Sequence, residues 1–109
     1  MAYDKGLAHR VEEIIEDQDG FEAKKMFGGV GYLLHGNMAC GVLNENLIVR
    51  VGKDAHEEAM NQAHTLPFDI TGRAMKGWVM VTPEGYEADT ELEDWVNKGV
   101  EFSLTLPPK

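Results

Sequence analysis

A chain of 109 residues with a net charge of −9 is long enough to form one domain with its own hydrophobic core, without disulfides or a structural metal. Hydrophobic residues make up 43% and charged residues 27%, which is typical of a globular protein and excludes a disordered or fibrous chain. No apolar run reaches the ~18 residues that span a membrane, and no signal-peptide pattern opens the chain. Because Cys40 stands alone, no internal disulfide is possible, and we expect a cytoplasmic protein.

The charge is unevenly distributed along the chain. Residues 23–53 contain four basic residues and one acidic residue, whereas residues 1–22 and 84–109 are strongly acidic. An acidic domain is repelled by the phosphate backbone, so direct nucleic-acid binding is not expected. The basic stretch still permits the binding of a small anion.

The first predicted element is a helix over residues 3–17. Asp4 is expected to cap its N-terminus, and its apolar residues fall on one helical face: Leu7, Val11, Ile14 and Ile15. Asp19-Gly20 is expected to end it.

Residues 26–43, M-F-G-G-V-G-Y-L-L-H-G-N-M-A-C-G-V-L, contain five glycines among bulky apolar residues. Glycine costs about 1 kcal/mol against alanine inside a helix, so the pattern favours strands joined by tight turns. It predicts strands over residues 24–27, 30–34 and 38–43, followed by a strand over 47–51. Together these would form an antiparallel β-meander.

The second half of the chain adds two helices and further strands. Asp54 and Glu57 predict a capped helix over residues 55–63, and a loop with an optional short strand at 68–70 follows. Residues 78–82 alternate as a strand, and the Thr90–Glu93 pattern predicts the start of a C-terminal helix that Pro107-Pro108 stops. The resulting order predicts a two-layer α+β domain with about five antiparallel strands and three helices. If the terminal helices cover one sheet face, an apolar opposite face would favour a homodimer or another protein partner.

Motifs along almost the whole chain resemble the N-terminal domain of the TfoX/Sxy family. The motifs are M-A-Y-D-K-G-L-A at 1–8, K-K-M-F-G-G at 24–29, G-N-M-A-C-G-V at 36–42, V-R-V-G at 49–52, D-I-T-G-R-A-M-K-G-W-V at 69–79 and L-P-P-K at 106–109. In that family the domain precedes a separate C-terminal domain in bacterial regulators of DNA-uptake competence. The resemblance therefore implies a free-standing copy of the N-terminal domain with a role in transcription-linked regulation. It brings no assigned catalytic residue.

Arg50 is the most informative single residue. In L-I-V-R-V at 47–51, alternation places Ile48 and Arg50 on the sheet face opposite to Val49. Its guanidinium needs a partner, and Asp69 is a candidate for a structural ion pair. The alternative is an anion site at the Gly28-Gly29 bend. The candidate residues for binding a ligand or partner are Lys25, Gly28, Gly29, Arg50, Asp69, Arg73 and Lys76.

Other site classes find little support in the sequence. M-F-G-G-V-G at 26–31 precedes a strand rather than a helix, which excludes a dinucleotide fingerprint. The four histidines and Cys40 lack metal-ligand spacing, and Cys40 is interpreted as a buried, inert thiol. The aromatic residues are interpreted as core rather than as an RNA-stacking platform.

The leading hypothesis is a non-enzymatic regulatory or adaptor domain that acts through protein contacts and needs no cofactor or metal. The alternative is a domain that binds a small anionic ligand through the Gly28-Gly29 bend with Arg50 and Arg73. A hydrolase or transferase has the least support, because no nucleophile–base pair is recognisable.

Overall fold

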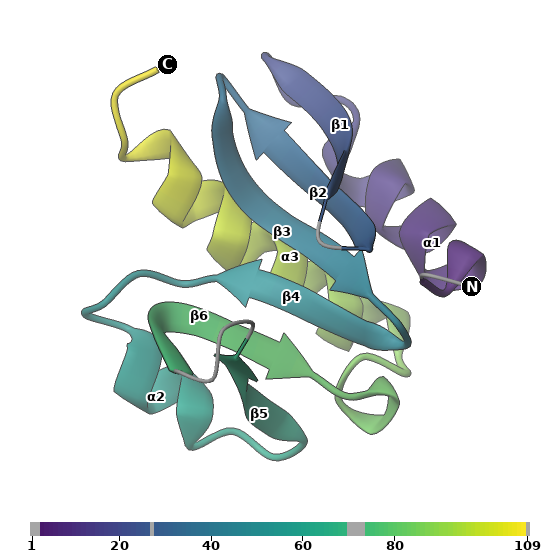
Figure 1. The fold of residues 1–109 in the computed structure, drawn as a ribbon, viewed down its shortest axis with the longest axis vertical. Helices are drawn as coiled ribbons and strands as arrows, with labels where there is room; N and C mark the ends of the chain where they lie inside the picture. Colours follow the sequence, from purple (N-terminus) through teal and green to yellow (C-terminus); the bar gives the residue numbers. More distant parts are fainter. Residues whose placement is uncertain (1–2, 27, 70–73, 109) are drawn as a thin grey trace.

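The computed structural model of the protein describes residues 3–26, 28–69 and 74–108, with Met26, Asp69 and Ala74 described by their backbone alone. Within these residues, three helices, one short 3-10 helix and six strands follow one another (Figure 1). In chain order they are α1 (Lys5–Ile15), β1 (Phe21–Met26), β2 (Gly29–Leu34), β3 (Asn37–Leu43), β4 (Asn46–Arg50), α2 (His56–Met60), β5 (Thr65–Asp69), β6 (Ala74–Val81), η1 (Pro83–Gly85) and α3 (Asp89–Leu104).

The strands form one antiparallel sheet in the order β1-β2-β3-β4-β6-β5. The predicted meander is confirmed over β1 to β4, and its turns use positive φ at His35 and Asn44. After α2, the β5–β6 hairpin returns so that β6 pairs with β4 and β5 becomes an edge strand. Pro67 is tolerated in β5 because one side of an edge strand needs no ladder hydrogen bonds.

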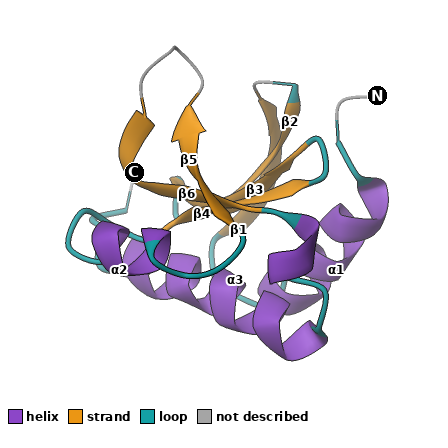
Figure 2. Cartoon of the chain, turned by 90° about the horizontal axis from the view of Figure 1, so that it is seen from below, coloured by secondary structure: helices purple, strands orange, loops and turns teal. Residues whose placement is uncertain are grey.

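All three helices lie on the same side of the sheet, so the molecule has two layers (Figure 2). The predicted α+β class is confirmed, with six strands instead of about five because residues 65–69 form a complete strand. The main core lies between the layers and includes Val11, Tyr32, Val49 and Val96, all fully buried. Gly99 lets α3 approach β3 closely, because a Cβ there would collide with the carbonyl oxygen of Ala39.

The helix starts show which local signals hold. The Asp4 cap is confirmed, because its carboxylate accepts a hydrogen bond of 3.1 Å from the Leu7 backbone N–H. The Asp54–Glu57 capping prediction is wrong, since α2 begins after Ala55 and has no side-chain cap. The predicted Thr90–Glu93 start is also wrong: α3 begins at Asp89, and Glu91 accepts from the Ala88 N–H at 3.3 Å.

Candidate functional site

The sheet surface opposite the helices, here called the helix-free face, is largely apolar. Register and alternation place Leu66, Met80 and Ile48 in one row across β5, β6 and β4. The row continues through Gly41 and Gly31, which carry no side chains. The same face carries Leu33, Met38, Leu43, Arg50 and Trp78. Its apolar character is unusual, because the solvent face of an antiparallel sheet normally carries polar residues.

Part of this face forms a second, smaller apolar cluster. Ile48 is fully buried and Phe68 is 2% exposed, although neither belongs to the core between the layers. The ring of Phe68 lies against that of Trp78, with their centres 5.8 Å apart. Leu66, in contrast, is 44% exposed at the edge of the sheet. The helix-free face therefore combines a buried patch with half-buried apolar side chains and the exposed Leu66 at its edge.

Arg50 lies at the end of β4, where its side chain reaches two aromatic rings from different layers. Its guanidinium carbon lies 5.2 Å from the ring centre of Trp78 in β6 and 5.4 Å from that of Phe102 in α3. Guanidinium–ring contacts of this kind are attractive. Among the described residues, Arg50 has no hydrogen bond or ion pair, so no carboxylate neutralises it there.

A pocket of about 600 Å³ opens beside this guanidinium. We call it the Arg50 pocket; its lining includes Arg50, Lys53, Lys76, Gly77, Trp78 and Phe102. Asp54 is the one acidic residue among the described residues that line the pocket, so the basic side chains outnumber it there. The pocket is therefore positive in a protein that is negative as a whole.

The backbone of Gly77 holds one wall of the Arg50 pocket. Its φ of +96° suits glycine, and its carbonyl accepts hydrogen bonds from the N–H groups of Val51 and Gly52 at 2.8 and 3.0 Å. Its own N–H donates to Nδ1 of His56 at 3.0 Å, which ties β6 to the start of α2. An accepting Nδ1 places the proton of a neutral imidazole on Nε2.

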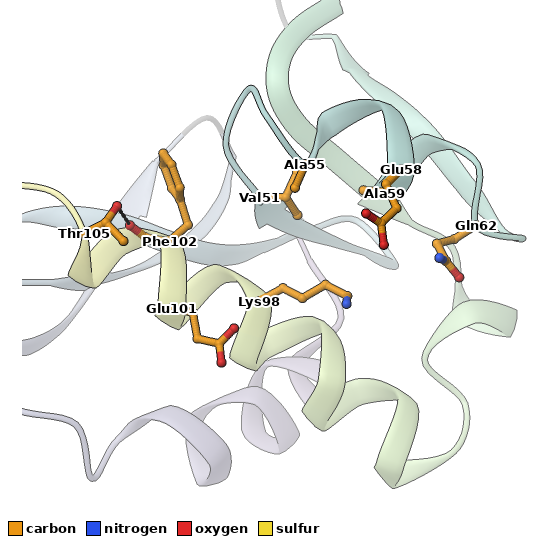
Figure 3. A pocket seen from close by; sticks show the side chains of 9 residues that line it. All are labelled: Val51, Ala55, Glu58, Ala59, Gln62, Lys98, Glu101, Phe102 and Thr105. Atoms are coloured by element: carbon orange, nitrogen blue, oxygen red, sulfur yellow. Dashed lines mark hydrogen bonds between the residues drawn. The ribbon is translucent and has the colours of Figure 1, made fainter.

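A second pocket of about 310 Å³, here called the α2–α3 groove, adjoins the first (Figure 3). Val51, Ala55, Phe102 and Thr105 line both pockets. Further along, the groove is lined by Ala59 and Gln62 from the α2 side and by Lys98 and Glu101 from α3, with Glu58 also at its wall. Its exposed surface is mainly apolar.

The structure brings together only part of the predicted site. Arg50 and Lys76 line one pocket, whereas Gly29 lies against Val42, near the C-terminal end of β3. At that end of β3, Leu43 pairs with Asn46, the first residue of β4. Arg50 lies four residues after Asn46, about 13 Å further along β4. Lys25 and Gly28 belong to that same β1–β2 end. Arg73 lies outside the described residues, and the side chain of Asp69 is not described, so their role stays a prediction.

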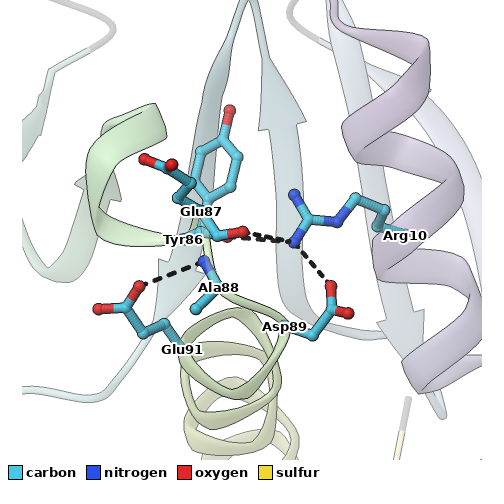
Figure 4. A network of polar contacts seen from close by, with 6 residues as sticks. All are labelled: Arg10, Tyr86, Glu87, Ala88, Asp89 and Glu91. Atoms are coloured by element: carbon cyan, nitrogen blue, oxygen red, sulfur yellow. Dashed lines mark hydrogen bonds and ion pairs between the residues drawn. The ribbon is translucent and has the colours of Figure 1, made fainter.

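Sequence reasoning missed one polar network at the junction of α1 and α3 (Figure 4). Nη2 of Arg10 donates to the carbonyls of Tyr86 and Glu87 at 3.3 and 3.2 Å and to Asp89 at 3.0 Å. The guanidinium also lies 5.9 Å from the centre of the Tyr86 ring. These contacts fix the chain just before α3. A basic residue on the first helix has no local signal for partners more than 70 positions away.

Two titratable groups of the described core have raised pKa values. Burial raises the pKa of Cys40 to about 12, which suits the predicted inert thiol. Burial also raises the pKa of Tyr32, and the hydrogen bond of its hydroxyl to Glu12 at 2.9 Å adds to the effect. Within the described ranges, no group of three or more His, Cys, Asp or Glu side chains is arranged to hold a metal.

Comparison with known proteins adds one positive finding. Residues 13–103 match the sequence profile of the TfoX N-terminal domain family. No curated protein matches the chain at a significant level. None of the helices in the described part of the structure is long and apolar enough to cross a membrane.

Proposed function

Since the chain belongs to the TfoX N-terminal domain family, we propose that it is a regulatory domain that acts through protein contacts and not through catalysis. The family is that of competence regulators, so the expected setting is the control of DNA uptake. The observation that carries the proposal is the helix-free face, an apolar sheet surface that no helix of the described chain covers.

The composition of this face supports a protein partner. Contiguous apolar surface on a small domain marks a contact site more often than it marks a solvent-facing sheet. Leu66 and Met80 are paired across β5 and β6, and Trp78 lies two residues before Met80, on the same face. Arg50 borders the patch, and Lys24 lies on β1, the edge strand farthest from β5. A partner with apolar anchors and an acidic rim would complement it.

The test uses the two large apolar residues that are exposed in the described part of the chain, which lie in different layers. Leu66 is 44% exposed on the helix-free face, and Leu104 is 51% exposed at the end of α3. Tagged wild-type protein, Leu66→Asp and Leu104→Asp are used to capture partners from lysate of the source cells, with and without nuclease. We expect one defined protein to be retained by the wild type and by Leu104→Asp, but not by Leu66→Asp.

Two outcomes would contradict the proposal. Capture that disappears with nuclease would make nucleic acid the partner, against the charge of the domain. Equal capture by both variants would remove the helix-free face from the interface. Light scattering of the purified protein adds a separate arm, because a stable dimer lost in Leu66→Asp alone would identify the partner as a second copy.

A further inference from the structure

We propose that the Arg50 pocket and the adjoining α2–α3 groove together bind a small monocarboxylate with an apolar body. The pocket receives the carboxylate and the groove receives the body. This site shares Arg50 and Trp78 with the helix-free face but does not include Leu66, so it adds a ligand to the proposed regulatory function and can fail while that function stands.

The arrangement around Arg50 leaves its hydrogen-bonding edge available. The guanidinium carbon lies 5.2 Å from the ring centre of Trp78 and 5.4 Å from that of Phe102, and neither ring carries an oxygen that could accept a hydrogen bond from it. The N–H donors of a guanidinium lie in its plane, and their fork matches the two oxygens of a carboxylate. No described residue accepts a hydrogen bond from them. The two rings hold the guanidinium in place, and its N–H donors have no acceptor among the described residues.

The charge near this guanidinium favours a negative ligand. Lys53 and Lys76 line the same pocket, both are exposed, and neither has an ion pair with a described residue. Asp54 offsets only part of this charge. An isolated surface lysine says little, but two lysines beside a stacked arginine in one concave site concentrate positive charge where solvent is partly excluded.

The groove beside the pocket fits an apolar chain or ring. Val51, Ala55 and Phe102 line both compartments and form an apolar passage between them. The two volumes, about 600 and 310 Å³, lie in the range of small-molecule sites, about 300–1,000 Å³. Among the described residues that line the groove, Glu58 and Glu101 outnumber the one basic residue, Lys98, so a second negative charge at the far end of the ligand is disfavoured. This selects a monoanion over a dicarboxylate.

The experiment follows the two tryptophan indole signals by heteronuclear NMR during titration with phenylbutyrate. Trp78 lines the Arg50 pocket, whereas Trp95 lies outside both compartments. We expect a saturable shift of the Trp78 signal and an unchanged Trp95 signal. Phenylbutanamide, which lacks the charge, and acetate, which lacks the apolar body, are each expected to bind at least about tenfold more weakly.

Variants separate recognition from general charge. Arg50→Lys keeps the charge but loses the fork, and we expect about tenfold weaker binding of phenylbutyrate. Lys76→Met tests the pocket at an exposed position that does not support the core, so its fold should be retained. Lys24→Met is the matched control, because it removes one positive charge on β1, the edge strand far from the pocket. Its affinity should equal that of the wild type.

Several results would overturn the proposal: no saturable shift of Trp78, equal binding of the acid and its amide, or equal losses in Lys76→Met and Lys24→Met. Tighter binding of inorganic phosphate than of phenylbutyrate would also overturn it, because the apolar groove would then be irrelevant. Capture of the protein partner by the wild type and its loss in Leu66→Asp would stand in each of these cases. Failure of the ligand site is therefore distinguishable from failure of the proposed function.

Discussion

Arg10→Ala should lower the stability of the fold far more than removal of its ion-pair partner. The guanidinium of Arg10 binds two backbone carbonyls, at 3.3 and 3.2 Å, and the Asp89 carboxylate at 3.0 Å. The Arg10 side chain is 32% exposed and that of Asp89 is 94% exposed. Hydrogen bonds from charged groups contribute about 1.5–3 kcal/mol, whereas exposed ion pairs contribute about 0–1 kcal/mol. Most of the stabilisation should therefore come from the carbonyls.

We expect Arg10→Ala to reduce the free energy of unfolding by about 2 kcal/mol, and Asp89→Asn by less than about 0.5 kcal/mol. For a domain of this size, the first loss corresponds to a fall in Tm of about 10 °C. Urea unfolding followed by circular dichroism measures both losses. If Asp89→Asn costs as much as Arg10→Ala, the carbonyl bonds contribute nothing and the reasoning is refuted.

Three further substitutions test the core. Gly99→Ala should lower the free energy of unfolding by at least about 1 kcal/mol despite the better helix propensity of alanine, because the new Cβ would meet the Ala39 carbonyl. The control is Asn97→Ala, at an exposed position on the same helix. Equal stability of the two variants would contradict the packing argument. Tyr32→Phe should cost about 1 kcal/mol in urea unfolding through loss of the bond to Glu12; a neutral result would mean that this bond adds nothing. The pKa of Cys40 is raised from 9.0 to about 12 in the folded state. The stability that the buried neutral thiol contributes is therefore fully present below about pH 9 and is lost as the pH rises toward 12. Cys40→Ala should therefore lose less stability than the wild type between these pH values, and parallel pH profiles would refute the assignment.

The local patterns of the sequence predicted the strands better than they predicted the helix starts. Alternation and glycine-rich turns define β2, β3 and β4 within about one or two residues, because a strand with a buried face has a strict period of two. The start of α3 was misplaced because Thr90 offered a good capping pattern, but Arg10 fixes the preceding carbonyls from another helix. A tertiary contact thus overrode a local preference.

β5 shows the same limit in a strand. Pro67 and the few periodic residues around it favoured a loop, yet residues 65–69 pair with β6. The pairing partner supplies the order that the local sequence lacks, and the edge position removes the cost of proline. A pattern-based prediction sees the proline but not the position of the strand in the sheet.

The candidate site divides in the same way between local and distant causes. Alternation alone placed Arg50 opposite to Val49, on the face where the structure has it. The grouping with Gly28-Gly29 did not follow, because two turns of a meander carry those residues to the other end of the sheet. Phe102, whose ring also contacts the guanidinium, lies 52 positions after Arg50 in α3. The sequence could identify the charged residue, but its contacts with Trp78 and Phe102 arise only when β6 pairs with β4 and α3 packs over the end of that strand.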